Sequence, residues 1–84
     1  MKKYPCPCCG FYTLEDQGEY SICPVCFWED DPYQRQNPDY EGGANNTSLN
    51  AAIENYRKIG VSEARFKYNV RPPYDEEKFP SEDK

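Results

Sequence analysis

The residues of this chain that could bind a metal ion are cysteines, grouped near its beginning in the segments CPCCG and ICPVCFWEDD. Cys6 and Cys9 form one C-x-x-C pair, and Cys23 and Cys26 form a second. A tight turn between two cysteines lets both thiolates approach one ion at about 2.3 Å, the usual length of a Zn–S bond. Two such turns can supply the four ligands of a tetrahedral site. The spacing therefore predicts one bound Zn²⁺ with these four cysteines as its ligands.

Other states of the four cysteines are open at this stage. Iron could occupy the same all-sulfur site, because spacing alone does not separate the two metals. Disulfides or free thiols are further alternatives, although clustered cysteines in a chain without a secretory signal more often bind metal. A site filled by four cysteines leaves no position for water or substrate, so we expect a structural metal. Such a metal can contribute on the order of 10 kcal/mol to folding.

Cys8, the remaining cysteine, lies inside the first C-x-x-C turn. It could be a small buried residue beside the metal cluster. Alternatively, it could be an extra thiol that exchanges as a ligand or senses oxidation. The sequence leaves both roles open.

The rest of the chain divides into segments of different character. Of its 84 residues, 1–75 are predicted to form a single zinc-stabilised domain, and the charged residues 76–84 a flexible tail. Residues 4–28 are expected to form a zinc hairpin, because the runs FYTL and EYSI favour strands and EDQG favours a turn. Residues 29–46 are rich in Pro, Gly, Asn and Asp, and predict an acidic aromatic loop without regular structure.

Residues 47–71 are predicted to be helical. Apolar side chains recur at helical spacing in TSLNAAIENYRKIG, where Thr47 or Ser48 can cap the start and Gly60 can end the helix. Ser62 could cap a second, shorter helix, EARFKYNV, which has to end before the prolines that follow it. The predicted fold is a small α+β domain, in which a zinc-ribbon-like or rubredoxin-like β-hairpin with two C-x-x-C knuckles precedes one or two α-helices.

Three segments of the chain, CPCCG, ICPVCFWEDD and GGANNTSLNAAIENYRKIG, together resemble the cysteine-rich CPCC family of small bacterial proteins. The resemblance extends over residues 4–75 and includes both cysteine pairs, the Trp-Glu-Asp run and the first helix. It implies a zinc-ribbon-like module followed by a helix, in a bacterial cytoplasm. The chain departs from rubredoxins, because its spacer between the pairs is shorter and Phe27, not glycine, follows the second pair.

The distribution of charge suggests a partner. The net charge is −5, and acidic residues concentrate between residues 15 and 41, whereas residues 57–71 are mostly basic. We therefore expect a non-catalytic module whose acidic aromatic loop binds a basic protein, as an immunity or regulatory protein would. Trp28 either packs over the zinc hairpin or forms an exposed anchor of that contact. The predicted partner-binding residues are Trp28, Glu29, Asp30, Asp31 and Tyr33.

The alternative function is nucleic-acid binding by a zinc ribbon, in which the basic segment 57–71 would contact the phosphates. The acidity of the whole chain argues against it. We expect no enzymatic activity and no catalytic residues, because the chain has no histidine and adjacent carboxylates usually face solvent or cap a turn. No apolar run is long enough to span a membrane, and without an export signal a cytoplasmic location is expected.

Overall fold

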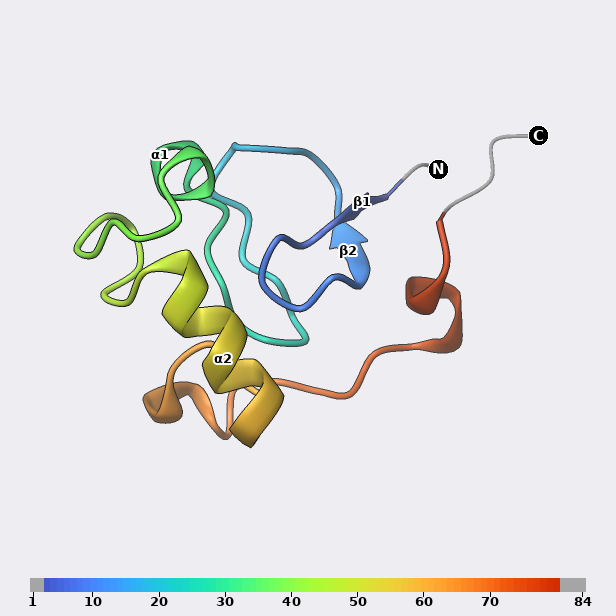
Figure 1. Ribbon diagram of the computed structural model, residues 1–84. Helices are drawn as coiled ribbons and strands as arrows, with labels where there is room; N and C mark the ends of the chain where they lie inside the picture. Colours follow the sequence, from blue (N-terminus) through green and yellow to red (C-terminus); the bar gives the residue numbers. More distant parts are fainter. Residues whose placement is uncertain (1–2, 81–84) are drawn as a thin grey trace.

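The computed structural model describes residues 3–80 and has a small α+β architecture (Figure 1). Two short strands, β1 at Tyr4–Pro5 and β2 at Tyr12–Leu14, form an antiparallel hairpin. Two α-helices follow, and two 3₁₀ helices lie nearer the C-terminus. The prediction of a hairpin followed by helix is confirmed. The four helical elements are α1 at Pro32–Gln36, α2 at Leu49–Ile59, η1 at Ala64–Phe66 and η2 at Asp75–Lys78.

The hairpin closes around the first cysteine pair and not around the spacer between the two pairs. β1 pairs with β2, and the Cys6 N–H donates to the carbonyl of Phe11 across the turn, at 2.9 Å. The predicted pairing of residues 11–14 with residues 19–22 is therefore wrong. The C-x-x-C turn, closed by the bond from the Gly10 N–H to the Cys6 carbonyl at 2.8 Å, reverses the chain and brings the residues that flank it together.

The second cysteine pair lies in a turn of the same form. Residues 23–27, the second knuckle, repeat the backbone hydrogen bonds of residues 6–10, the first knuckle. In each knuckle, the carbonyl of the first cysteine accepts from the residue after the second cysteine, at 2.8 Å. That residue has a left-handed backbone in both, with φ of +83° at Gly10 and +68° at Phe27. Glycine adopts this conformation freely, whereas phenylalanine must be held in it by its surroundings.

The segment 29–46 contains the short helix α1, so the prediction of a loop without regular structure is wrong there. The Asp31 carboxylate caps the helix by accepting from the N–H of Tyr33 at 2.8 Å, and Pro32 suits the first helical position. Hydrophobic periodicity does not reveal a helix that spans little more than one turn.

A buried polar network holds the residues that follow α1. Gln34 is fully buried. Its amide nitrogen lies within 3.2 Å of three backbone carbonyls, those of Tyr40, Asn45 and Thr47. Asn45 in turn bonds both backbone groups of Glu29, at 2.8 and 2.9 Å, in the manner of a neighbouring strand. These bonds satisfy buried polar groups and order a segment that has few apolar side chains to bury.

Gly43 passes so close to this network that a side chain does not fit there. A Cβ atom at this position would lie 2.5 Å from the Asp31 carboxylate and 2.9 Å from the Gln34 side chain. We expect Gly43→Ala to lower the free energy of unfolding by about 1–3 kcal/mol through overpacking. Urea denaturation followed by Trp28 fluorescence measures this loss. The control Glu41→Ala, exposed in the same segment, should change it by less than about 0.5 kcal/mol, and equal loss in both variants would contradict the steric explanation.

Helix α2 begins and ends within the predicted limits. The Ser48 side chain accepts from the N–H of Ala51 at 3.1 Å, and Gly60 takes the left-handed φ of +79° that ends the helix. Its apolar face packs against the core, which includes the cysteines of both knuckles. The helical residues in this contact are Leu49, Ala52, Ile53 and Tyr56.

The predicted second helix, EARFKYNV, is reduced to η1, and no side chain caps it. The segment is bound to the second knuckle instead. The Ser62 N–H donates to the Cys26 carbonyl at 2.8 Å, and the Arg71 N–H donates to the Pro24 carbonyl at 3.1 Å. Hydrogen bonds to the knuckle at both ends thus take the place of helical ones.

Between these two attachments, an aromatic contact joins the segment to the knuckle. The ring of Phe66 packs against that of Phe27, with centroids 4.6 Å apart. This contact accounts for the left-handed backbone of Phe27, because the packed ring offsets a conformational cost of roughly 1–2 kcal/mol.

The predicted flexible tail comprises residues 76–84, of which 81–84 lie outside the described residues. The described part is folded back onto the hairpin, where η2 contacts β2 (Figure 1). Glu77 is buried, and its carboxylate forms a two-point ion pair with the guanidinium of Arg71, at 2.8 and 2.9 Å. The hydrogen bonds from Arg71 lower the pKa of Glu77 below its ordinary value.

Loss of the Glu77 charge should release this part of the chain. Because the pKa of Glu77 is lowered by folding, its ion pair contributes stability above the ordinary pKa of 4.5, and this contribution is lost as the pH falls through the lower pKa of the folded chain. At pH 7, we expect Glu77→Gln to speed tryptic cleavage after Lys78 by about fivefold, as a local loss of about 1 kcal/mol implies.

The matched control is Glu76→Gln, which removes an exposed carboxylate from the same turn. It should leave the cleavage rate unchanged at pH 7. Similar rates for the two variants would show that the Arg71–Glu77 ion pair does not hold this segment.

Candidate metal centre

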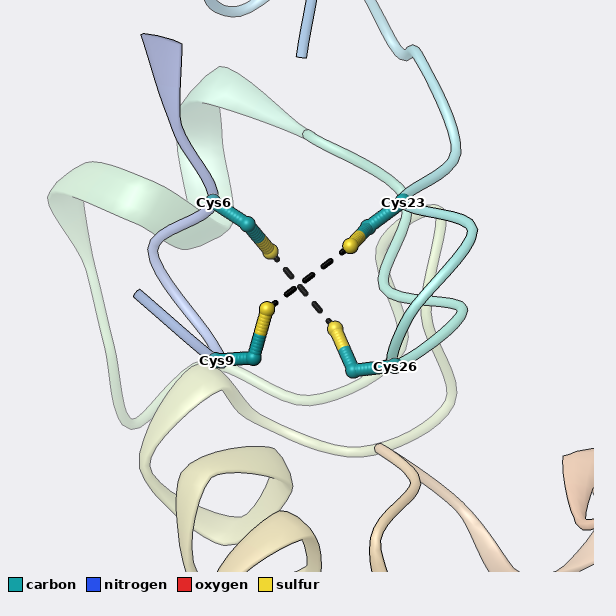
Figure 2. A group of neighbouring side chains, drawn as sticks. All are labelled: Cys6, Cys9, Cys23 and Cys26. Atoms are coloured by element: carbon teal, nitrogen blue, oxygen red, sulfur yellow. Dashed lines mark hydrogen bonds between the residues drawn. The ribbon is translucent and has the colours of Figure 1, made fainter. Parts of the chain in front are cut away.

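The two knuckles place four sulfur atoms around one point (Figure 2). Cys6 and Cys9 come from the first knuckle, Cys23 and Cys26 come from the second, and the side chains point toward one another. The four Sγ atoms all lie within 4.8 Å of one another. The Sγ atoms of Cys6 and Cys26 are 3.6 Å apart, and those of Cys9 and Cys23 are 3.7 Å apart. The four cysteines predicted as ligands are therefore brought together by the fold.

The geometry of the cluster fits a tetrahedral metal ion. Four sulfurs at about 2.3 Å from a central ion define a tetrahedron with edges of about 3.8 Å. The two distances of 3.6 and 3.7 Å are close to this value. Sulfur donors favour zinc, iron or copper(I) over hard cations such as Mg²⁺ and Ca²⁺. The cluster can hold one metal ion, and four thiolates would complete its coordination.

The sulfur cluster is part of the hydrophobic core. Cys23 and Cys26 are fully buried and Cys6 nearly so, whereas Cys9 is partly exposed. Trp28 is 0% exposed and belongs to the same cluster of buried residues. Of the two roles predicted for Trp28, packing over the cysteine hairpins is confirmed and exposure as an anchor is wrong.

Mutual hydrogen bonds and burial shift the pKa values of the four clustered cysteines. Three of these thiols have a pKa far above that of an ordinary cysteine, because each is hydrogen-bonded to Cys23 and because burial disfavours the thiolate. They are the thiols of Cys6, Cys9 and Cys26. The same bonds, above all the one from Cys26, lower the pKa of Cys23. A metal ion binds thiolates and therefore competes with protons for these sulfurs, so its affinity decreases as the pH decreases.

Cys8 is buried beside the four sulfurs, but it is not one of them. The neighbouring Cys8 thiol contributes to the raised pKa of Cys26. The burial of Cys8 was one of the two predicted roles and is confirmed, whereas exchange as a ligand stays a prediction. Tyr56 of α2 also lies near the cluster, and burial together with the nearby cysteines raises the pKa of Tyr56 to about 12. The helix is thus packed directly onto the candidate metal centre.

The two aspartates after Trp28 are used inside the fold. Asp30 is fully buried, and its carboxylate pairs with the guanidinium of Arg35 at 2.8 Å and accepts from the N–H of Gly18 at 2.7 Å. One oxygen of Asp31 caps α1, and the other accepts from the N–H of Ala44 at 2.9 Å. Both carboxylates therefore order the backbone around them.

The predicted partner-binding residues do not form one surface. Tyr33 is 57% exposed and Glu29 is half-buried. The other three are buried, so their prediction as contact residues is wrong. The physical reason is that the two carboxylates are already bonded within the fold, and the tryptophan ring packs in the core beside the cysteines. These three residues are Trp28, Asp30 and Asp31.

Sequence reasoning missed several residues that shape the site. Thr13 on β2 is buried, and its hydroxyl oxygen lies 3.0 Å from the Sγ of Cys23. Gln34 and Asn45 form the network that orders the segment after α1. No spacing signals these contacts, because each joins positions that only the folded chain brings together.

The basic segment 57–71, on which the alternative of nucleic-acid binding depends, is largely paired with carboxylates. Arg57 and Lys58 lie 3.6 and 3.7 Å from Glu54 on the same helix. The segment therefore presents less positive charge to a partner than its sequence suggests. Its other ion pairs join Arg65 to Glu63 and Arg71 to Glu77.

Comparison with known proteins identifies a family for most of the chain. Residues 4–77 match the model of the family described as Cysteine-rich CPCC. The matched region contains both knuckles and both α-helices. No curated protein matches the chain. Within residues 3–80, no helix has the length and apolar character needed to cross a membrane.

The four clustered cysteines and Cys8 should differ in their effect on metal binding. Cys23→Ser removes one ligand, so we expect loss of stoichiometric metal and unfolding of the domain, because a structural metal contributes on the order of 10 kcal/mol. Cys8→Ser leaves all four ligands in place and should retain one metal ion per chain. Elemental analysis of protein prepared without oxygen measures the stoichiometry and distinguishes zinc from iron.

Trp28 fluorescence provides a second measurement of the same assignment. Because this buried tryptophan packs with the cysteines, a chelator should shift its emission toward that of an exposed indole. A parent chain that keeps its buried emission after complete metal removal would contradict a structural role for the metal. Loss of metal from Cys8→Ser would contradict the assignment of the four ligands.

Proposed function

Because the chain belongs to the cysteine-rich CPCC family and brings its four paired cysteines together, we propose that it is a protein-interaction module without catalytic activity, folded around one structural Zn²⁺. Zinc is the usual ion of closed four-cysteine sites. The proposed fold type is a zinc ribbon, in which two knuckles of the same form face each other across the ion. Two knuckles with matching backbone hydrogen bonds support this proposal.

A structural role is favoured because the reactive groups of the site are already engaged. Four thiolates fill a tetrahedral shell, which leaves the ion no open position for water or substrate. Asp30 and Asp31, the adjacent acids that could have formed an acid–base pair, are buried in an ion pair and a helix cap. The metal would therefore stabilise the fold, and the function would lie on the surface that the fold presents.

The surface that best suits a partner is formed by two tyrosines of the segment 29–46, one in α1 and one after it. Tyr33 and Tyr40 are 57% and 44% exposed, and their rings meet edge to face with centroids 4.7 Å apart. The exposed acids Asp39 and Glu41 flank Tyr40 in the sequence. We call these four residues the tyrosine patch. Its backbone is held by Asp31 and by the Gln34 network, so it is ordered before a partner binds.

The charge of the tyrosine patch indicates the chemistry of the partner. Aromatic rings can supply much of the binding energy of a protein contact, and surrounding carboxylates favour and orient a basic partner. We propose a protein with a basic surface as that partner. An immunity or regulatory protein in a bacterial cytoplasm would have this role, and the excess of acids between residues 15 and 41 supports it.

The proposal is tested by identifying the partner and measuring its affinity for matched variants. Metal-loaded protein is used to isolate partners from the native host, and each candidate is then purified and titrated. The double variant Tyr33→Ser with Tyr40→Ser should weaken binding by at least about 30-fold, as expected for loss of contact residues worth about 2 kcal/mol. Glu41→Lys should slow association and reduce its dependence on salt.

The control is Tyr68→Ser, which removes a tyrosine that is 92% exposed on another segment. It should leave the affinity unchanged. Metal content is measured for every variant, so that loss of fold is not mistaken for loss of contact. A partner that binds the double variant as tightly as the parent would contradict the tyrosine patch, and binding of nucleic acid in place of a protein would favour the alternative function.

A further inference from the structure

The two knuckles share their backbone form, but their first cysteines differ in the hydrogen bonds that reach the sulfur. The Sγ of Cys23 accepts from the N–H of Val25 at 3.4 Å and lies 3.0 Å from the hydroxyl oxygen of Thr13. Val25 belongs to the second knuckle, whereas Thr13 lies on β2, close to the first knuckle. The Thr13 hydroxyl is therefore a contact from one half of the cysteine cluster to a sulfur of the other half.

The direction of this hydrogen bond follows from the chemistry of the two groups. A metal-bound thiolate has no proton and can only accept, whereas a threonine hydroxyl can donate. Thr13 is 7% exposed, and as a β-branched residue in a strand it has few χ1 rotamers to choose from. The hydroxyl is thus held against the sulfur, and a donor to an anion forms a stronger bond than a donor to a neutral group.

Thr13 also stands between the sulfur and the solvent. It lines an open groove of about 420 Å³, together with Ser21, Ile22, Pro24 and the Arg71–Glu77 ion pair. Cys23 is 0% exposed and does not line the groove, whereas Thr13 does. The same side chain that donates to the thiolate therefore covers it.

We propose that Thr13 is a positioning residue of the metal centre, whose hydroxyl donates to the Cys23 thiolate and determines how tightly the centre retains its ion. This inference rests on the proposed structural metal. Four thiolates around one divalent ion leave a net charge of about −2 in a largely buried site, and each donor to a sulfur reduces the cost of that charge. Partners of this kind behind the ligands typically change metal affinity by about 10–100-fold.

The closing experiment compares variants that differ in one hydroxyl or one methyl group. Thr13→Val keeps the shape and removes the hydroxyl, and Thr13→Ser keeps the hydroxyl and removes the methyl. Ser21→Ala is the matched control, because Ser21 lines the same groove but donates to Asp16 at 2.7 Å. Zinc affinity is measured by competition with a chromophoric chelator, and the chains are also loaded with Co²⁺ to record the sulfur-to-metal charge-transfer band.

We expect Thr13→Val to bind zinc about 10–100-fold more weakly and to shift the Co²⁺ charge-transfer band to lower energy, because the sulfur loses a donor. Thr13→Ser and Ser21→Ala should stay close to the parent in both measurements. If Thr13→Val does not fold, Thr13→Ala compared with Thr13→Ser gives the same test of the hydroxyl.

Two results would overturn the role of Thr13 alone. One is a hydroxyl-free variant with the affinity and the band of the parent. The other is weaker binding with an unchanged band and no recovery in Thr13→Ser, which would indicate a packing role only. A parent chain that binds neither Zn²⁺ nor Co²⁺ would instead overturn the structural metal itself, together with the inference drawn from it.

Discussion

The convergence of four cysteine sulfurs on one point is the constraint on which the rest of this structure depends. The two knuckles are separate tight turns, and the strands around them are too short to hold them together by backbone pairing. Other parts of the chain then pack onto the paired knuckles. Helix α2 lays its apolar face over them, and the segment after it is hydrogen-bonded to the second knuckle at Pro24 and Cys26. A metal ion shared by both knuckles would therefore stabilise more of the domain than its ligands alone.

Buried hydrogen-bonded polar groups compensate for the small number of aliphatic side chains. Around α1, the core continues as buried polar groups. Asp30 pairs with Arg35, and Asp31 accepts from backbone N–H groups. Gln34 and Asn45 bond each other and the backbone around them. Buried polar groups of this kind specify one arrangement, because each displaced partner leaves an unsatisfied group. The acidic character of this segment thus has a structural origin at Asp30 and Asp31, and only the remaining exposed acids are left to meet a partner.

Much of the cysteine site could be predicted from sequence, since a C-x-x-C spacing is a local property that a tight turn imposes on its two sulfurs. Helix α2 could be predicted for a similar reason, because its apolar period, its Ser48 cap and its Gly60 end lie within one short stretch. Helix α1 could not, because it is too short to show an apolar period and because its Gln34 is held by the distant Asn45. The helical pattern after Ser62 was misleading, since bonds to Cys26 and Pro24 outweigh local propensity there.

The sequence by itself determined the two knuckles and the long helix, because the groups that form them lie a few residues apart. It also indicated the family to which the chain belongs. Only the tertiary structure decided which of the neighbouring acids and aromatics face inward. Trp28 and Asp30 are buried whereas Tyr33 is exposed, although the three lie within six positions of one another. Burial depends on contacts with Arg35, Gly18 and the cysteine cluster, and a residue's own type and spacing do not specify those contacts.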